Sequence, residues 1–381
     1  MTEHIAIVGG GTGGTVLANT LAEKLGTELD TGAVRITLFN DGPDHVYKPV
    51  WLYVAFGQRE PADGRRPLRE VVDDRVDIRQ DYVLDVDHGR RELELQTVVD
   101  PVAYDKLVVA TGAKLAPEQV PGLAEGAHHF YGEDGAQALR DELLTMEGGH
   151  VVLSVVGTPH MCPAAPLEFT FMLDDWLRER DRRDEFEITY TYPIMRVHGN
   201  EQIAAWAEPR LEARNVAVET MFNAEAVDPD AGAITAMEGT TLDYDLLVAI
   251  PPHTGSDFVE SAGLGDGGWV DVDRHTLEAT GFEDSYAIGD AAQTGVPKAG
   301  SAAHYQANVV AQRLASEVRD RPATAVYDGK TLCFIETGMD DATFVEFDYE
   351  TPPSPGEPTR ALHWSKLAYN ESYWLTARGL L

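Results

Sequence analysis

The feature that most constrains the fold of this chain is a glycine-rich stretch near its N-terminus. Gly9-Gly10-Gly11-Thr12-Gly13-Gly14 fits the pattern G-x-G-x-x-G. Residues 4–8, directly before it, form a short apolar run that predicts a buried parallel strand. Residues 15–25 have apolar side chains at helical spacing, and residues 34–39 predict the next strand. Together they predict a βαβ unit of the kind that binds dinucleotides, and hence an α/β fold.

Each glycine of this pattern has a physical task. Gly9 makes the tight turn, Gly11 lets the backbone approach a pyrophosphate, and Gly14 lets the helix pack on the strand. The helix N-terminus offers free N–H groups and the positive end of its dipole to the phosphates. Asn40 follows the second strand, where an acid usually binds the ribose hydroxyls. Its carbonyl oxygen can accept the same bonds, and a role in the following turn is the alternative.

Two later segments bear on which dinucleotide binds. Residues 104–112 (YDKLVVATG) and residues 285–291 (SYAIGDA) resemble the ATG and GD motifs of two-dinucleotide-domain flavoproteins. In that superfamily the aspartate of the second motif binds the ribityl chain of FAD. The resemblance therefore implies FAD as the cofactor, held by Thr111, Gly112, Gly289 and Asp290 together with the glycine-rich loop.

The apolar pattern of the remaining chain predicts its organisation. A second βαβ-like unit is expected from residues 150–156, about 166–183 and 187–192, with other elements at residues 106–110, 246–250, 286–288, 302–318 and 344–347. We expect two Rossmann-like domains of the glutathione-reductase type plus a C-terminal α+β segment. The expected domains are an FAD-binding domain (residues 1–113 and 283–325), a second Rossmann-like domain (114–282) and the C-terminal segment (326–381).

The excess of acidic residues limits the kinds of molecule that this chain can bind. The chain has 64 acidic against 30 basic residues, a formal net charge of −34, which argues against a nucleic-acid partner. The acids are spread along the chain rather than gathered in a tail, so adaptation to high salt is the favoured explanation. Two cysteines exclude a disulfide scaffold and suit a reducing cytoplasm. We expect no signal peptide, no membrane-spanning helix and no metal site.

The second βαβ unit lacks a complete nucleotide loop. Only Gly157 follows the strand at residues 150–156, and Pro159 and Pro163 stiffen the turn and remove backbone donors that a pyrophosphate would use. This argues against a site for NAD(P)H. The same loop carries Cys162, and the only other cysteine is Cys333. Position alone leaves open whether they are inert buried thiols or a reactive pair.

A family resemblance bears on that choice. Residues 158–168 (TPHMCPAAPLE) resemble the C-x-G-A-P segment of sulfide:quinone oxidoreductases, and residues 326–334 with 345–349 resemble their Y-D-G-x-x-x-C and E-F-D-Y segments. In that family two cysteines beside the flavin react with sulfide by thiol–disulfide exchange and pass two electrons to FAD. The resemblance implies that Cys333 takes the incoming sulfur, that Cys162 faces the flavin, and that a quinone receives the electrons.

The resemblance also implies further site residues, and this sequence differs from the family's motifs at several positions. It implies catalytic roles for His198 and Glu168, although each has a structural alternative, and flavin contacts for Lys48, Val83 and Lys298. Residues 113–131 contain no cysteine, so FAD is expected to be bound non-covalently. Ala164 replaces a glycine of the cysteine motif, and Ala303-His304 replaces an alanine–glutamate pair near the quinone end.

The expected location follows from the same reasoning. A quinone requires contact with a membrane, and the last eighteen residues carry Trp364, Tyr369, Tyr373 and Trp374 with Lys366 and Arg378. The alternative for this aromatic segment is a packed terminal helix or a dimer contact. We expect a cytoplasmic protein, peripheral on the inner face of the cell membrane, and a homo-oligomer. The alternatives are an NADH:quinone-type oxidoreductase, a relative using another thiol substrate or a soluble acceptor, and a non-catalytic flavin- or sulfur-binding protein.

Overall fold

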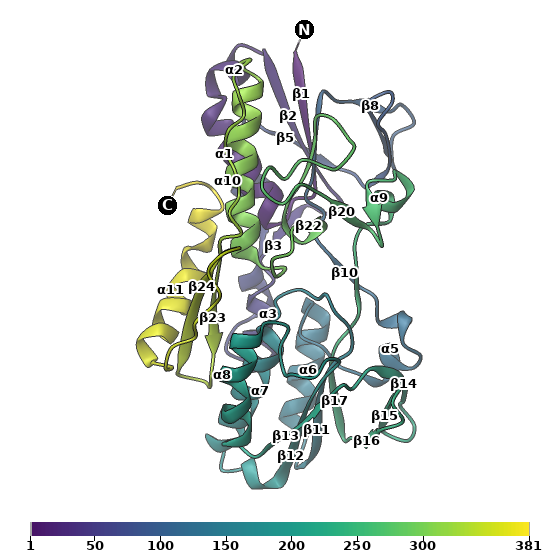
Figure 1. Cartoon of the computed structure of the whole chain (residues 1–381), viewed down its shortest axis with the longest axis vertical. Coiled ribbons are helices and arrows are strands. Elements are labelled where there is room, and N and C mark those ends of the chain that lie inside the picture. The colour runs from purple at the N-terminus through teal and green to yellow at the C-terminus, as the bar shows by residue number, and fades with distance from the viewer. Residues whose placement is uncertain (1, 381) are drawn as a thin grey trace.

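The computed structural model describes residues 2–380, which form two parallel sheets with helices packed on them (Figure 1). The first sheet has the strand order β21-β9-β1-β2-β5, and every neighbouring pair in it is parallel. Its strands are β1 (Glu3–Val8), β2 (Val34–Asn40), β5 (Asp77–Gln80), β9 (Lys106–Val109) and β21 (Ser285–Ala287).

Two long helices cover one face of the first sheet. α1 (Thr12–Lys24) starts at the glycine-rich loop, and α10 (Gly300–Glu317) lies beside it although it comes almost 300 residues later (Figure 1). Their apolar faces join the strands in one buried cluster that includes Ile5, Leu17 and Val310. Burial of such side chains stabilises the fold by about 1.5–3 kcal/mol each.

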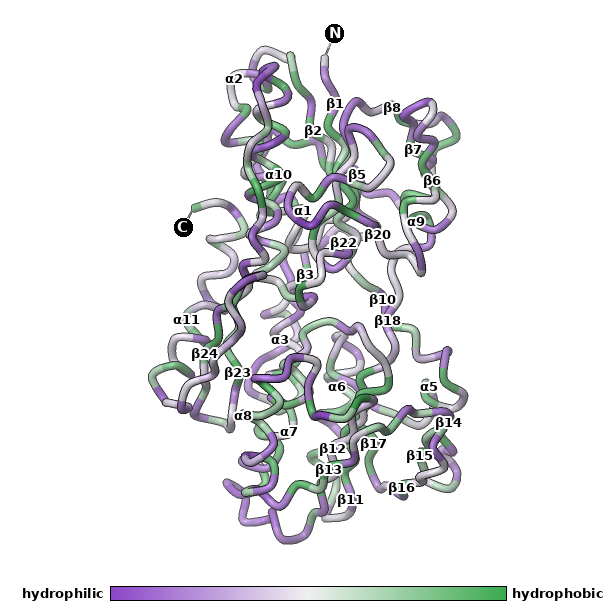
Figure 2. The backbone as a smooth tube through the Cα atoms, in the orientation of Figure 1, coloured by the Kyte–Doolittle hydropathy of each residue, from purple (hydrophilic) through white to green (hydrophobic). Residues whose placement is uncertain are grey.

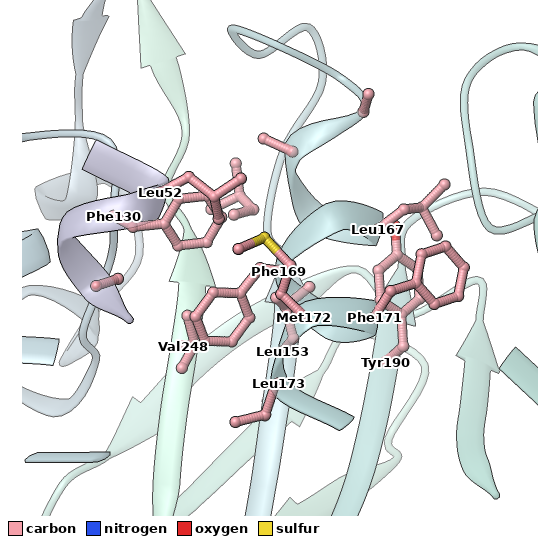
Figure 3. Close-up of a cluster of buried hydrophobic side chains, with 14 of the residues drawn as sticks. Leu52, Phe130, Leu153, Leu167, Phe169, Phe171, Met172, Leu173, Tyr190 and Val248 are labelled. Atoms are coloured by element: carbon pink, nitrogen blue, oxygen red, sulfur yellow. The ribbon is translucent and has the colours of Figure 1, made fainter. Parts of the chain in front are cut away.

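The second sheet has the order β13-β12-β11-β17 and is also parallel throughout. It consists of β11 (Gly149–Val155), β12 (Phe186–Tyr192), β13 (Val216–Thr220) and β17 (Leu246–Ile250), with α6 (Glu133–Thr145), α7 (Ala165–Arg178) and α8 (Glu201–Glu212) beside it. Phe169 of α7 stacks on Phe130, with 4.9 Å between ring centroids, and faces Leu153 and Val248 of the strands (Figure 3).

The C-terminal part is an antiparallel hairpin followed by a helix. β23 (Thr331–Glu336) pairs with β24 (Ala342–Phe347), and α11 (Arg360–Thr376) packs on both. β23 also contacts α7 and α10, so the hairpin joins the two large sheets along one side of the molecule (Figure 1).

Shorter elements complete the chain. β10 (Lys114–Leu115) and β18 (His253–Thr254) pair where the chain passes between the two sheets. The others are α2 (Gly26–Asp30), β3 (Asp44–Val46), α3 (Val50–Ala55), η1 (Pro61–Gly64), β4 (Arg65–Pro67), α4 (Leu68–Val71), β6 (Val83–Asp87), β7 (Glu92–Leu95), β8 (Val102–Ala103), η2 (Pro117–Gln119), α5 (Leu123–Gly126), η3 (Arg183–Glu185), β14 (Ala224–Asp228), β15 (Ala233–Ala236), β16 (Thr241–Asp243), α9 (Asp257–Ser261), β19 (Gly265–Asp266), β20 (Trp269–Asp271), η4 (Gly289–Ala291) and β22 (Ala292–Gln293).

The predicted α/β fold class is confirmed by the two parallel sheets. Hydrophobic stretches run along the central strands and hydrophilic ones occupy the outer loops (Figure 2), which is why the apolar runs located the strands within one or two residues. The helix expected over residues 166–183 ends earlier, at Arg178. The domain boundaries stay predictions. Within residues 2–380, no helix combines the length and the apolarity needed to cross a bilayer.

Candidate active site

The glycine-rich loop has the geometry that a pyrophosphate needs. Gly9 adopts φ +110°, and a Cβ there would lie 2.4 Å from the Ala110 carbonyl oxygen. A Cβ on Gly14 would lie 1.8 Å from the carbonyl oxygen of Gly9, so only glycine lets the helix approach so closely. A Cβ on Gly11 would meet nothing within 4 Å. Gly9 and Gly14 therefore close the turn, and Gly11 leaves its backbone open to a ligand.

Asn40 holds this loop in place. Its Oδ1 accepts a hydrogen bond from the Gly10 N–H at 2.8 Å, and its Nδ2 donates to the Gly42 carbonyl at 2.8 Å. The alternative of a role in the turn is thus realised. The second lone pair of Oδ1 and the second N–H of Nδ2 remain for a ribose hydroxyl.

The two flavin motifs meet at the carboxyl ends of β9 and β21. The Thr111 hydroxyl is buried with no hydrogen-bond partner among residues 2–380. Gly112 and Gly289 adopt φ +73° and +69°, and a Cβ on Gly112 would meet nothing within 4 Å. Burial raises the pKa of the Asp290 carboxyl, against the opposing charges of Lys48 and Lys298. An orphaned hydroxyl beside a desolvated carboxyl and open backbone fits a polyol such as the ribityl chain of FAD.

Lys298 ties the Asp290 loop to the loop of Cys162. Its Nζ donates to the Asp290 carbonyl at 2.5 Å and lies 3.7 Å from the ring centroid of Trp269. Its own carbonyl accepts a hydrogen bond from the Cys162 N–H at 2.8 Å. Burial lowers the pKa of the Lys298 ammonium to about 8.

The other two flavin candidates lie differently. Lys48 is exposed, and its Nζ donates to Met161 Sδ at 3.2 Å, next to Cys162. The Val83 side chain is buried in the core cluster of the first sheet, so only its backbone is available to a cofactor.

The fold brings the two cysteines together from distant parts of the sequence. Cys162 lies in the loop between β11 and α7 with φ +45°, an unusual conformation for a residue other than glycine. Its carbonyl accepts hydrogen bonds from the Ala165 N–H and the Tyr131 hydroxyl. Cys333 lies on β23, which packs on α7 and on the core around Met161. Both thiols are free.

The surroundings disfavour the charged form of both thiols. Burial raises the pKa of Cys333 to about 12, with a further rise from the Glu168 carboxylate. The Cys162 side chain is open to solvent on one side, but protein surrounds it on the others, so desolvation raises its pKa well above the usual range. The charges of Glu168 and Cys333 raise the Cys162 pKa further, while the Lys366 ammonium lowers it. A negative charge on Cys333 would therefore make Cys162 harder to deprotonate, and the charges of Glu168 and Lys366 act on both thiols.

A buried network of charged and polar groups adjoins the cysteine pair. The Lys366 ammonium contacts Glu168 Oε1, which also accepts a hydrogen bond from the Glu336 N–H at 2.8 Å. Glu336 Oε1 accepts from the Tyr53 hydroxyl at 2.7 Å, and its Oε2 lies 3.0 Å from His363 Nδ1. All five side chains are buried. The network links α3, α7, β23 and α11.

Most of this network is not apparent from the sequence. The sequence singles out Glu168 as a site candidate but gives Lys366 no place in the site, and Lys366 is only 8% exposed. It is buried because the Glu168 carboxylate offers it a partner inside the core. Glu336, His363 and Tyr53 come from three separate segments, and no spacing in the sequence connects them.

The four C-terminal aromatic residues fall into two groups, one buried and one exposed. Tyr373 and Trp374 are buried, and Tyr373 stacks on Tyr47 with 3.8 Å between ring centroids. These two residues are part of the core of the first sheet, so for them the structure shows the alternative of a packed terminal helix. Trp364 and Tyr369 remain 63% and 37% exposed.

His198 lies in the loop after β12 and is buried. Its Nδ1 accepts a hydrogen bond from the Asn200 N–H at 2.9 Å. Burial, with a smaller effect of His160, lowers the pKa of His198 to about 4. The structure therefore places His198 beside His160, two residues before Cys162, rather than in the Glu168 network.

The molecule has relatives along nearly its whole length. The chain is 24% identical to the mitochondrial sulfide:quinone oxidoreductase of Mus musculus over 362 residues, covering 92% of this chain and 79% of the mouse protein. It is 24% identical to the sulfide-quinone reductase of Aquifex aeolicus over 98% of this chain and 91% of that protein.

The fold agrees with these similarities. The crystal structure of the sulfide:quinone oxidoreductase from Aquifex aeolicus superposes with a TM-score of 0.87 at 23% identity, covering 99% of this chain and 92% of that one. The family described as pyridine nucleotide-disulphide oxidoreductase matches residues 3–307, which is more than half of the 381 residues. The chain therefore belongs to the pyridine nucleotide-disulphide oxidoreductase family, a family of FAD-dependent oxidoreductases.

Proposed function

We propose that this protein oxidises sulfide to sulfur or polysulfide through Cys162 and Cys333 and transfers the electrons through FAD to a quinone. The observation that carries the proposal is the meeting of the only two cysteines, 171 residues apart, at the contact between α7 and β23. The similarity to sulfide:quinone oxidoreductases over nine tenths of the chain supports it.

In the oxidised form the two cysteines would share a disulfide. Hydrosulfide attacks one sulfur of this bond, so a new S–S bond forms to the incoming sulfur and the Cys162–Cys333 bond breaks. One cysteine becomes a persulfide and the other leaves as a thiolate with the electron pair of the broken bond. The Lys366 ammonium, which lowers the pKa of both thiols, stabilises that thiolate.

The backbone favours Cys162 as the cysteine next to the cofactor. Its N–H binds the Lys298 carbonyl, and the Lys298 side chain reaches the Asp290 loop. Cys333, on the opposite strand, then takes the incoming sulfur. Bound FAD would supply two-electron transfer between sulfur and quinone, held non-covalently by the backbone around Gly11, Gly112 and Gly289 and by Asp290.

Quinone reduction also consumes two protons, which buried groups must deliver. Glu168 on α7 and Lys366 on α11 adjoin the cysteine pair. Burial raises the pKa of Glu168 against the opposing charge of Lys366, whereas the pKa of Lys366 is raised by the Glu168 and Glu336 carboxylates against the opposing effect of burial. We assign to the Glu168 carboxyl and the Lys366 ammonium the task of holding these protons. The exposed Trp364 and Tyr369 on α11 are the side chains that would meet a lipid surface carrying the quinone.

The test is an anaerobic titration of the purified holoenzyme with sulfide in high salt, followed by the flavin spectrum. The wild type should be bleached and then reoxidised by a soluble quinone, whereas Cys162→Ser and Cys333→Ser should stay oxidised. Dithionite should reduce all three proteins, which controls for a damaged FAD site. If both variants respond to sulfide as the wild type does, the cysteine mechanism is wrong.

NADH provides the opposing test. The loop at Gly157 has one glycine and two nearby prolines in place of a full nucleotide loop, so NADH should not bleach the flavin. Rapid bleaching by NADH would favour an NADH:quinone-type oxidoreductase instead.

A further inference from the structure

The C-terminal helix reaches the glycine-rich loop through a buried aromatic side chain. Tyr373, near the end of α11, is only 5% exposed. Its hydroxyl lies 2.8 Å from Thr12 Oγ1, at the start of α1, and 2.7 Å from His45 Nε2 on β3. Asn19 of α1 gives the helix a second anchor, because its Nδ2 donates to the Ala377 carbonyl at 2.7 Å. The end of α11 is therefore fixed to the helix that begins at the loop.

His45 carries this contact to the backbone of the loop. Its Nδ1 lies 2.9 Å from the Gly10 carbonyl oxygen, and the Thr15 hydroxyl donates to the same oxygen at 3.0 Å. Both lone pairs of this carbonyl are therefore in use. The side chains of His45 and Thr15 are fully buried. Because the Gly10 N–H donates to Asn40 Oδ1, side chains hold the peptide groups on both sides of Gly10.

The chemistry of these groups sets the direction of each hydrogen bond. A carbonyl only accepts, so the proton of the His45 ring is on Nδ1. Burial lowers the pKa of His45 to about 4, which keeps the ring neutral and leaves Nε2 as an acceptor. The Tyr373 hydroxyl then donates to Nε2 and accepts from the Thr12 hydroxyl. One hydrogen-bond chain, formed by Thr12, Tyr373, His45 and Gly10, thus runs from α1 through α11 and back to the loop.

Holding the Gly10 carbonyl fixes the direction of the next N–H. The Gly10 carbonyl and the Gly11 N–H belong to one planar trans peptide group, in which they point in opposite directions. Because the carbonyl faces His45 and Thr15, the Gly11 N–H faces away from them. Gly11 is exposed, and its N–H donates to no backbone carbonyl among residues 2–380. The hydrogen-bond chain therefore presents a free donor on the open side of the loop, where a helix N-terminus binds phosphate.

We propose that Tyr373 is a positioning residue for FAD, which acts through His45 to hold the Gly10–Gly11 peptide so that the Gly11 N–H binds the pyrophosphate. α11 is then part of the cofactor site, although Tyr373 acts on the cofactor through His45 rather than by contact. Without the Tyr373 hydroxyl, His45 Nε2 is buried without a donor, and the ring is no longer held against the Gly10 carbonyl. A peptide group that is free to turn binds the pyrophosphate less tightly, because binding must then also order it.

The same contacts imply that FAD and the C-terminal helix stabilise each other. If the docking of α11 increases the affinity for FAD by some factor, bound FAD favours the docked helix by the same factor. α11 also carries Lys366, the partner of Glu168 beside the cysteines. FAD binding and this ion pair therefore depend on one helix.

The experiment compares two hydroxyls on stacked rings. Tyr373→Phe removes the hydroxyl of the hydrogen-bond chain. Tyr47→Phe is the matched control, because the Tyr47 hydroxyl also binds α11, but at Asn370. After removal of FAD from each protein, its rebinding in high salt is measured by flavin fluorescence. Tyr373→Phe should bind FAD about tenfold more weakly, the effect of one buried hydrogen bond left unmade, whereas Tyr47→Phe should keep the wild-type affinity.

Further readouts separate positioning from packing. Denaturant unfolding of the two apoproteins should show equal losses of stability, because each variant removes one buried hydroxyl. In the holoproteins at saturating FAD, the phosphorus NMR resonances of the pyrophosphate should shift in Tyr373→Phe and stay unchanged in Tyr47→Phe. FAD should also protect the amides of α11 from hydrogen exchange less in Tyr373→Phe than in the wild type.

His45 provides an independent test if Tyr373→Phe does not fold. His45→Asn keeps a donor near the Gly10 carbonyl and should bind FAD more tightly than His45→Leu, which keeps none. Adding Tyr373→Phe to His45→Leu should weaken FAD binding no further, because Tyr373 acts through His45.

Three results would overturn the inference and leave the contacts of α11 as packing alone. They are wild-type FAD affinity with unchanged phosphorus resonances in Tyr373→Phe, an equal loss of affinity in Tyr47→Phe, and equal affinities of His45→Asn and His45→Leu. None of these measurements depends on sulfide oxidation, so they are independent of the proposed function.

Discussion

At the scale of single residues, the charge of Glu168 adds to the effect of burial on the acidity of both cysteines. Its carboxylate raises the pKa of Cys162 and of Cys333, after the larger effect of burial, while Lys366 acts in the opposite sense. The thiols are thus kept protonated until the chemistry requires a thiolate.

The variant Glu168→Gln should therefore make both thiols more acidic. Loss of the negative charge lowers their pKa values, and one unit corresponds to about a tenfold faster alkylation at a given alkaline pH. The measurement is the pH profile of iodoacetamide labelling of the reduced protein. Asp174→Asn serves as the control, because Asp174 is buried on the same helix but paired with Arg183. An unchanged profile for Glu168→Gln would contradict the assignment.

Residue types predicted part of this site and missed another part. The pairing of Cys162 with Cys333 is an inference from motif resemblance and stays a prediction, supported by the contact of β23, which carries Cys333, with α7, which follows the Cys162 loop. The sequence does not predict the burial of Glu336 and His363 beside this site. Their positions depend on contacts between β23 and α11, which no sequence pattern reports.

At the scale of elements, the contact of α7, β23 and α11 depends on a buried ion pair. Removing one partner of such a pair leaves an uncompensated charge in the core and costs about 3–5 kcal/mol, whereas removing both costs far less. Glu168 and Lys366 are 3% and 8% exposed. Removing one partner should therefore weaken the packing of the C-terminal helix more than removing both.

We expect Lys366→Met to lower the free energy of unfolding by about 3 kcal/mol and the double variant Lys366→Met/Glu168→Gln to recover most of it. Burial opposes the Lys366 charge, but the carboxylates of Glu168 and Glu336 raise its pKa well above 10.5. Its stabilisation is therefore present below the unfolded-state pKa and is lost as pH rises through the folded-state value. Denaturant unfolding in high salt measures both effects. Equal losses in the single and double variants would contradict the coupling.

The elements themselves were largely predictable. Buried strands such as β17 are apolar and β-branched along their whole length, so they are recognisable without their neighbours. α11 is different, because its buried set includes His363 and Lys366 beside Tyr373 and Trp374. A polarity pattern assigns those two polar residues to the surface, and only tertiary contacts with Glu336 and Glu168 reverse the assignment.

At the scale of the whole molecule, the dominant property is the net charge of −34. Self-repulsion of that size destabilises the compact state at low ionic strength, and salt screens it over a Debye length of about 10 Å at 0.1 M. The composition thus predicts a protein adapted to high salt, a property that concerns the surface and is independent of the fold.

The melting temperature of the holoenzyme should therefore rise steadily as potassium chloride is increased from the millimolar to the molar range. Screening accounts for the rise up to about 0.5 M, where the Debye length falls below the spacing of surface charges. Differential scanning calorimetry with FAD in excess measures it. A melting temperature that is constant or falls with salt would contradict the adaptation, and size-exclusion chromatography in the same series would test the expected homo-oligomer.

Lys298 serves two loops at once, with its carbonyl on the Cys162 N–H and its ammonium on the Asp290 carbonyl. Replacing the side chain keeps the carbonyl that accepts from the Cys162 N–H and changes the local charge. Under the proposed function, the residue at position 298 would therefore change the reduction potential of the bound flavin. A series of neutral, basic and acidic residues there would change how strongly the enzyme draws electrons from sulfur without moving the atoms between which they pass.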